Sequence, residues 1–195
     1  MRYIIMCDGK GKRWNNYKGI PKHFIQVHGE PLIKRIVRQL NRKDGDADVI
    51  ITSHDKRYDI EGALRYEPKN NILEIDRFTD ELIQDDICFL YGDTYYTDST
   101  IDIILNTDPI DIVFFGNEER IVGIKIKDGK LFKKHVDKVR DLFLNKKIKD
   151  CKGWQVYQSF MNLEFDRKII DKKFVVVDKD TIDFNTLEDY ENNKL

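Results

Sequence analysis

The sequence predicts a three-layer α/β/α domain built around a mostly parallel β-sheet. Short apolar runs rich in β-branched and aromatic residues alternate with amphipathic segments, starting with an apolar run at residues 3–6. Strands that alternate with helices are typical of βαβ units, in which ligands bind at the carboxyl ends of the strands. The chain of 195 residues is long enough for one such unit, and we expect a single domain over residues 1–195.

The expected strands are the apolar runs at residues 3–6, 49–52, 87–91, 112–115, 121–126 and 174–177. A helix is predicted over residues 31–40, because its apolar side chains share one face and Pro31 suits a first turn. A weaker helix is expected over residues 71–82, and another after Ser99. The last helix is predicted to begin at Thr186, whose side chain suits an N-cap with Asp189 three residues further on.

One segment predicts a different local structure. Residues 121–138 contain V-G-I-K-I-K and L-F-K-K-H-V, two alternating runs joined by an Asp-Gly turn. This pattern is typical of a β-hairpin. We therefore expect a small β-hairpin excursion from the main sheet.

Composition excludes several classes of partner. Charged residues make up 35% of the chain, yet the net charge is −1, and basic residues alternate with acidic ones. A nucleic-acid partner usually requires a basic excess, so none is expected. The sequence contains neither a signal peptide nor an apolar run of membrane-spanning length, which predicts a cytoplasmic protein with no membrane partner. Three separated cysteines predict neither a disulfide framework nor a zinc site, and a homo-oligomer remains open.

The clearest functional motif is M-C-D-G-K-G-K-R-W at residues 6–14, directly after the first predicted strand. A glycine-rich turn at a strand end presents backbone N–H groups that can bind phosphate, and Arg13 adds positive charge. The spacing fits neither a Walker P-loop nor the Rossmann G-x-G-x-x-G, because Trp14 stands where a third glycine is required. The motif alone therefore indicates phosphate binding without naming a family.

Together with I-P-K-H-F-I-Q-V-H-G-E-P-L-I-K-R-I, this motif resembles the N-terminal signature of the nucleotidyltransferases with a GT-A-like (Rossmann-like) fold, which include the sugar-1-phosphate nucleotidylyltransferases. The positions that match the signature are Gly9, Gly11, Arg13, Pro21, Lys22, Gly29, Pro31 and Leu32. I-C-F-L-Y-G-D-T resembles the family's strand that ends in a magnesium-binding aspartate, which assigns Asp93. T-I-D-F-N-T-L-E-D-Y-E resembles the segment that supplies the second metal ligand, which assigns Asp183.

The resemblance implies a function. It is the Mg²⁺-dependent transfer of a nucleoside monophosphate from a nucleoside triphosphate to a sugar 1-phosphate or polyol phosphate, with release of pyrophosphate. Such products commonly feed nucleotide sugar and polysaccharide synthesis. Arg13 and Lys22 would be catalytic, and Asp93 and Asp183 would bind Mg²⁺. The predicted hairpin is similar to the one after which such enzymes carry Glu-Lys, here Asp137 and Lys138, with the lysine near the acceptor phosphate. G-W-Q-V-Y resembles the family's G-x-Y strand, so the acceptor would also contact Gly153. The nucleotide would contact Met6, Cys7, Asp8, Gly9, Gly11, Lys12, Arg13, Lys22, Ser53 and Gly92.

Two other functions stay open. A GT-A glycosyltransferase would use a nucleoside diphosphate-sugar, but it would hold it with a D-x-D strand end, whereas this strand ends in G-D-T-Y. A non-catalytic nucleotide-binding regulator is kept open by Asp8, because relatives have Ala or Gly before the first loop glycine. An acidic side chain there would repel a triphosphate unless it were turned toward the base or the metal.

Overall fold

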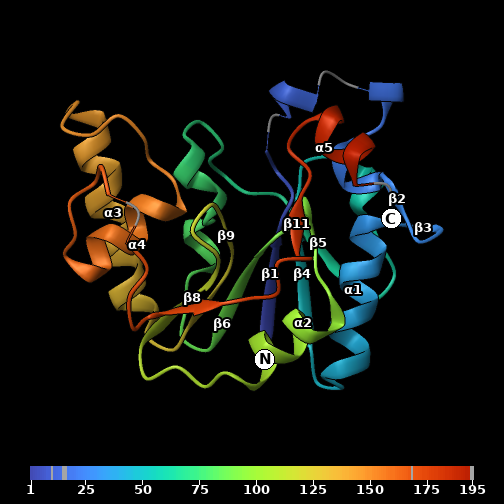
Figure 1. Ribbon diagram of the computed structural model, residues 1–195, viewed down its shortest axis with the longest axis horizontal. Helices are drawn as coiled ribbons and strands as arrows, with labels where there is room; N and C mark the ends of the chain where they lie inside the picture. Colours follow the sequence, from blue (N-terminus) through green and yellow to red (C-terminus); the bar gives the residue numbers. More distant parts are fainter. Residues whose placement is uncertain (10, 15–16, 168, 194–195) are drawn as a thin grey trace.

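A seven-stranded sheet forms the centre of the computed structural model, which describes residues 1–9, 11–14, 17–167 and 169–193 (Figure 1). β9 runs antiparallel to its neighbours β6 and β8, and the remaining pairs in this sheet are parallel. The predicted α/β class with a mostly parallel sheet is therefore confirmed. In spatial order the strands are β10 (Phe174–Val176), β8 (Ile112–Gly116), β9 (Ile121–Ile126), β6 (Ile87–Tyr91), β1 (Arg2–Met6), β4 (Asp48–Thr52) and β5 (Leu64–Tyr66).

Helices cover both faces of the sheet, giving the three predicted layers. α1 (Leu32–Lys43) and α2 (Asp98–Asn106) lie on one face, whereas α3 (Gly129–Leu144) and α4 (Gly153–Met161) lie on the other (Figure 1). The short α5 (Leu187–Asn192) ends the described chain. None of the helices in the described ranges is long and apolar enough to cross a membrane.

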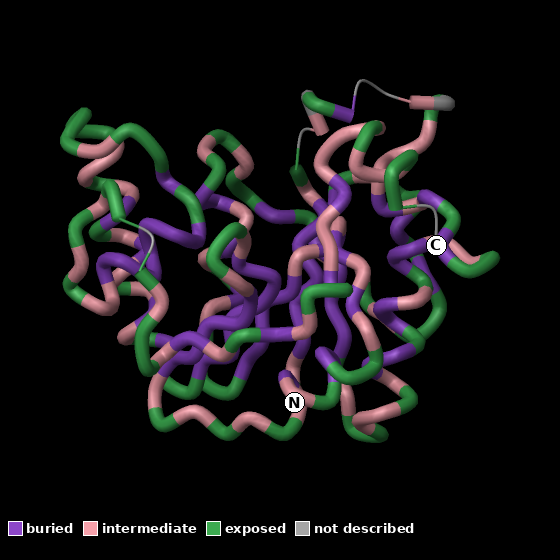
Figure 2. Tube along the Cα trace, in the orientation of Figure 1, coloured by how far each residue is buried: buried purple, intermediate pink, exposed green. Residues whose placement is uncertain are grey.

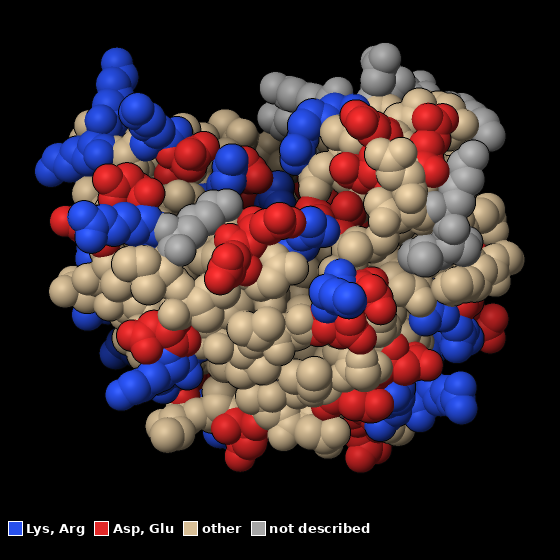
Figure 3. Space-filling model, in the orientation of Figure 1, with Lys and Arg blue, Asp and Glu red and all other residues tan. Residues whose placement is uncertain are grey.

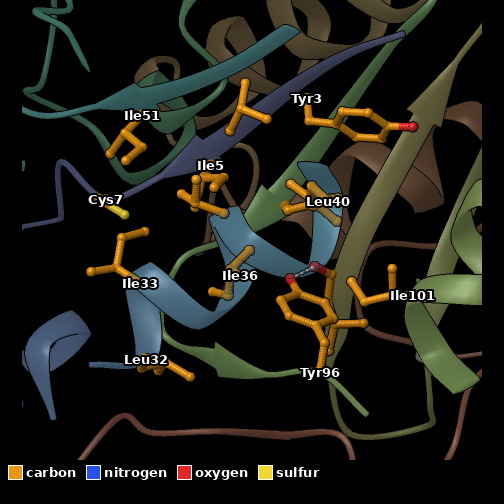
Figure 4. Packing of buried hydrophobic residues seen from close by; sticks show 14 of the residues in the cluster. Tyr3, Ile5, Cys7, Leu32, Ile33, Ile36, Leu40, Ile51, Tyr96 and Ile101 are labelled. Carbon is orange, nitrogen blue, oxygen red and sulfur yellow. Dashed lines mark hydrogen bonds between the residues drawn. The ribbon is translucent and has the colours of Figure 1, made fainter. Parts of the chain in front are cut away.

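The alternation of side chains along β1 explains how one strand serves two cores. Tyr3 and Ile5 pack with α1 on one face, and Ile4 and Met6 pack on the opposite face. Figure 4 shows the first of these cores, with Ile36 of α1 facing β1. The inner strands β1, β4, β6, β8 and β9 are buried along nearly their whole length (Figure 2), as expected for a sheet covered by helices, whereas the edge strands β5 and β10 are more exposed.

Several predicted elements are confirmed. α1 begins at Leu32, so Pro31 is the N-cap residue directly before the helix and not part of its first turn as predicted. α2 spans the helix expected after Ser99. α5 begins with a capping box, because the Thr186 hydroxyl accepts the N–H of Asp189 while the Asp189 carboxylate accepts the N–H of Thr186.

The predicted hairpin over residues 121–138 is wrong. β9 forms as expected, but the second run is helical and belongs to α3. Asp128 is an N-cap that accepts the N–H of Leu131 at 2.8 Å, so the Asp-Gly pair starts a helix instead of a hairpin turn. A Cβ at Gly129 would lie 2.4 Å from the carbonyl carbon of Gln84, which is why glycine occupies this position.

The helix predicted over residues 71–82 is also wrong. The segment contains two short 3₁₀ turns, Glu74–Arg77 and Asp80–Leu82. The carboxylate of Asp76 accepts the backbone N–H groups of Ile72 and Leu73, at 3.0 and 2.8 Å. Such local hydrogen bonds between a side chain and the backbone compete with α-helix formation.

The topology brings several loops to one edge. β1, β4 and β6 are parallel, so the segments that follow them meet at the carboxyl edge of the sheet. β9 is antiparallel to both β6 and β8, so β8 runs in the same direction as β6. The turn that leads from β8 to β9 therefore lies at this same edge. Two further short strands, β7 (Thr94–Tyr95) and β11 (Ile182–Asp183), pair antiparallel beside it. A separate ribbon is formed by β2 (Gln26–Val27) and β3 (Glu30–Pro31).

Candidate active site

A cleft of about 540 Å³ opens at the carboxyl edge of the sheet. Figure 3 shows the surface hollowed at the top of the view, with basic and acidic side chains gathered around the hollow. The residues that line the cleft come from segments far apart in the sequence: Asp8, Gly9, Gly11, Arg13, Lys22, Asn71, Ile72, Leu73, Glu74, Arg77, Tyr91, Asp93, Thr94, Glu119, Arg120, Ile121, Lys152, Gly153, Trp154, Asp183 and Asn185.

The glycine-rich turn after β1 forms one wall. Gly9, Gly11 and Arg13 line the cleft, and Gly11 has a φ of +54°, a conformation that favours glycine. Trp14 anchors the turn, since its indole is buried and donates to the carbonyl of Ile20 at 3.0 Å. The side chain of Lys12, a predicted nucleotide ligand, lies outside the described part of the structure.

Lys22 pairs directly with Asp93. The ammonium donates to Asp93 Oδ2, and each side chain is 13% exposed. Burial, the largest single influence on the pKa of Asp93, works to raise it. The charge of Lys22 and further nearby positive groups outweigh that effect, so the pKa of the carboxyl is lowered and the group stays ionised.

Asp183 is brought to Asp93 by the pairing of β7 with β11. Asp183 is in register with Thr94, and the backbone N–H of Phe184 donates to the carbonyl of Asp93 at 2.8 Å. Burial raises the pKa of Asp183, and the negative charge of Asp93 adds to that rise. Arg120 Nη1 opposes it from 2.6 Å. Two residues 90 positions apart in the sequence thus line the same cleft as one acidic pair.

This pair fits a magnesium ion of the kind used with phosphate substrates. Mg²⁺ takes oxygen ligands and is commonly held by one or two carboxylates, with substrate phosphates and water completing the shell. Among the described residues, no group of three or more His, Cys, Asp or Glu side chains could hold a metal ion. The residues present thus fit Mg²⁺ through two carboxylates, Asp93 and Asp183.

Asp8 lines the cleft and contacts His54, which lies just beyond the end of β4. Its carboxylate accepts the backbone N–H of His54 at 3.2 Å and contacts His54 Nδ1 at 3.0 Å. The hydrogen bond to Asp8 raises the pKa of His54. The Asp8 carboxylate therefore has hydrogen-bond partners of its own at His54 while it lines the cleft.

Four predicted nucleotide ligands lie beneath the cleft surface instead of lining it. Met6, Cys7, Ser53 and Gly92 are buried. Burial raises the pKa of the Cys7 thiol well above its usual range, so the group stays protonated. Gly92 packs directly against Cys7, which indicates a packing role for this pair.

The predicted acceptor ligands separate into two groups. Gly153 lines the cleft at the start of α4, not on the strand that its resemblance implied, and a Cβ there would lie 2.6 Å from the Tyr91 hydroxyl. Asp137 and Lys138 lie on α3 and are absent from the cleft lining, because the hairpin on which their assignment depended is a helix. Asp137 instead pairs with Arg140 at 2.7 Å.

Sequence reasoning missed three cations of the cleft. Arg77, Arg120 and Lys152 line it together with the predicted Arg13 and Lys22. No motif marks them, and the chain has 34 lysines and arginines to choose from. The one available signal was the place of Arg120 between two predicted strands.

Comparisons with known proteins agree with the fold. No protein-family model and no curated protein matches the sequence. Among solved structures, the CTP:phosphocholine cytidylyltransferase of Streptococcus pneumoniae matches with a TM-score of 0.60 and 14% identity, over 98% of this chain and 96% of that one. The inositol-1-phosphate CTP transferase of T. maritima matches with a TM-score of 0.59 and 14% identity, over 96% and 90% of the two chains.

A third match is the 2-C-methyl-D-erythritol 4-phosphate cytidylyltransferase of Thermus thermophilus, with a TM-score of 0.57 and 12% identity over 98% and 95% of the two chains. Identities this low establish a common fold. The GT-A-like fold predicted from the sequence is thus confirmed, while the activity has to be argued from the site.

Proposed function

We propose that this protein is a nucleotidyltransferase that moves a nucleoside monophosphate from a nucleoside triphosphate to a phosphorylated small molecule, such as a sugar 1-phosphate or polyol phosphate. One observation carries the proposal: Asp93 and Asp183 meet at a cleft whose adjoining wall is the glycine-rich turn with Arg13 and Lys22. The folds of the cytidylyltransferases described above support it.

The residues suit a reaction that depends on charge placement. The second pKa of a phosphomonoester is about 6, so the attacking phosphate is already anionic and needs no strong general base. Arg13 and the turn would hold the triphosphate, and Lys22 would offset charge that develops at the α-phosphorus. The acceptor oxygen attacks that phosphorus, the bond to the bridging oxygen breaks, and pyrophosphate leaves with the electron pair.

Asp93 and Asp183 would hold Mg²⁺, which when bound supplies Lewis-acid stabilisation of the phosphate charge. Lys22 and Arg120 neutralise these carboxylates in turn, because each pairs with one of them. The site thus contains balanced charges before substrate arrives. This balance is compatible with a cation and a polyanion that enter together.

The test is pyrophosphate release in the presence of Mg²⁺. The four nucleoside triphosphates and dTTP are each combined with a panel of sugar and polyol phosphates. Asp93→Asn is expected to reduce release by at least about 100-fold, because a lost transition-state contact of this kind costs that much. Asp102→Asn is the matched control, since Asp102 also pairs with a lysine, Lys43 at 2.6 Å, but on the exposed surface of α2.

Three outcomes are informative. Release that requires one nucleotide and one acceptor class, and that Asp93→Asn abolishes, supports the proposal. Full activity in Asp93→Asn would contradict it. Binding of a triphosphate that is equal in both proteins, with no turnover in either, would favour a non-catalytic nucleotide-binding regulator.

A further inference from the structure

The turn between β8 and β9 has a defined conformation that presents Arg120 to the cleft. Asn117 Oδ1 accepts the N–H groups of Glu119 and Arg120, at 3.0 and 3.1 Å, and the Arg120 carbonyl accepts the N–H of Asn117 at 2.9 Å. A Cβ at Gly116 would lie 2.0 Å from that carbonyl oxygen, so this close approach requires glycine. The Arg120 side chain is 26% exposed and reaches Asp183.

The order of the strands places Arg120 and the glycine-rich turn on different sides of the acidic pair. β6 lies between β9 and β1 in the sheet. Asp93 follows β6, Arg13 and Lys22 follow β1, and Arg120 directly precedes β9 at the same edge. The acidic pair is therefore flanked by cations on two sides, with the glycine-rich turn on only one of them.

In-line transfer at phosphorus requires the attacking and leaving oxygens to lie on opposite sides of the phosphorus. A triphosphate held by Arg13 and Lys22 leaves the β9 side for the attacking group. A guanidinium is well suited there, because it can donate two parallel hydrogen bonds to a phosphate. Lys152 lies on the same side of the cleft as Arg120. Its neighbour Gly153 is close to Ile121, the residue after Arg120, because a Cβ built at Gly153 would lie 3.8 Å from Ile121 Cδ1.

We infer that Arg120 binds the phosphate of the acceptor, an inference that rests on the proposed nucleotidyltransferase activity. It gives Arg120 the role that sequence reasoning assigned to Lys138, which lies on α3 outside the cleft lining. Arg120 has two competing partners, since Nη1 pairs with Asp183 at 2.6 Å and Nη2 donates to Glu119 at 2.8 Å, so a phosphate would have to displace or share these contacts. The experiment must therefore separate acceptor binding from a simple counter-charge to a metal ligand.

The experiment compares Arg120→Gln and Arg120→Lys with the wild type, with circular dichroism to verify folding. KM is measured separately for the acceptor, the triphosphate and Mg²⁺. Arg120→Gln is expected to raise the acceptor KM about 10- to 100-fold, the usual effect of losing a hydrogen bond to a charged group, with the triphosphate KM changed less than about twofold. Arg120→Lys should recover part of the loss. Arg38→Gln is the matched control, because Arg38 pairs with Glu30 on the exposed surface of α1.

A second measurement does not depend on turnover. Inorganic phosphate is titrated into each protein and its dissociation constant is followed by NMR chemical shifts. Arg120→Gln is expected to weaken phosphate binding about 10-fold or more, while a nucleoside triphosphate binds as it does to the wild type.

The results decide as follows. A selective rise in acceptor KM supports the inference. An altered Mg²⁺ requirement with an unchanged acceptor KM overturns it, because Arg120 would then act only through Asp183. If the wild type transfers no nucleotide to any acceptor, the proposed function fails, and the phosphate titration still decides whether Arg120 binds the anion or not.

Discussion

Gly92 offers a sharp test of how the cleft is supported from below. A Cβ at this position would lie 2.3 Å from Cys7 Sγ, 3.1 Å from the Met6 carbonyl oxygen and 3.2 Å from His23 Cδ2. The backbone of Gly92 is outside the left-handed region, so alanine could adopt its φ and the expected effect is steric. Gly92→Ala should therefore destabilise the protein by pressing against Cys7.

The magnitude follows from the contacts. Inserting one methyl group into a closely packed core costs about 1–3 kcal/mol. Cys7→Ala alone should cost about 1 kcal/mol, from lost burial and a small cavity. In the variant that combines Cys7→Ala with Gly92→Ala, the Cys7 Sγ atom at 2.3 Å is removed, and the other two neighbours of the new methyl group lie at 3.1 and 3.2 Å. The double variant should therefore be more stable than the sum of the two single effects predicts, by about 1–2 kcal/mol.

The assay is equilibrium unfolding in urea, followed by circular dichroism, for the wild type, both single variants and the double variant. Gly45→Ala is the control, because a Cβ at Gly45 meets nothing within 4 Å. It should change stability by less than about 0.5 kcal/mol. Additive effects of the Cys7 and Gly92 substitutions, or a Gly92→Ala variant as stable as Gly45→Ala, would refute the reasoning.

Two further predictions concern buried and exposed charge. Lys125 is buried, and its ammonium donates to three carbonyl oxygens at the end of α2, at 2.6, 2.9 and 3.1 Å. Lys125→Met should therefore lower the free energy of unfolding by about 2–4 kcal/mol in urea titrations, whereas Lys127→Met, at an exposed position, should change it little. Equal stability of the two variants would contradict this prediction. Asp8→Asn should return the raised pKa of His54 toward the ordinary histidine value, as measured by NMR titration of the imidazole. Because the pKa of His54 is higher in the folded state than in the unfolded state, the stability contributed by this contact is fully present below the unfolded-state pKa and is lost as pH rises through the folded-state pKa. If the free energy of unfolding depends on pH in the same way in Asp8→Asn as in the wild type, the contact does not contribute to stability.

Local sequence determined much of the fold because its signals act over a few residues. The apolar run before Met6 needed only hydrophobicity and β-propensity to be recognised as a strand. Thr186 and Asp189 satisfy each other's backbone N–H groups within one turn, so the start of α5 was visible in the sequence. The glycine-rich turn with Arg13, and the strand end at Asp93, were likewise local motifs.

Tertiary structure decided the remainder, because the relevant forces join distant segments. The start of α3 packs so closely against the backbone of Gln84 that position 129 has to be glycine, a contact that no local pattern encodes. Asp183 reaches Asp93 only through the pairing of β11 with β7, and Arg120 reaches Asp183 only because β9 returns to the edge where β6 ends. The sequence by itself thus singled out Asp93, Asp183 and the glycine-rich turn, all of which line the cleft, while the opposing wall of the cleft required the three-dimensional arrangement of the sheet.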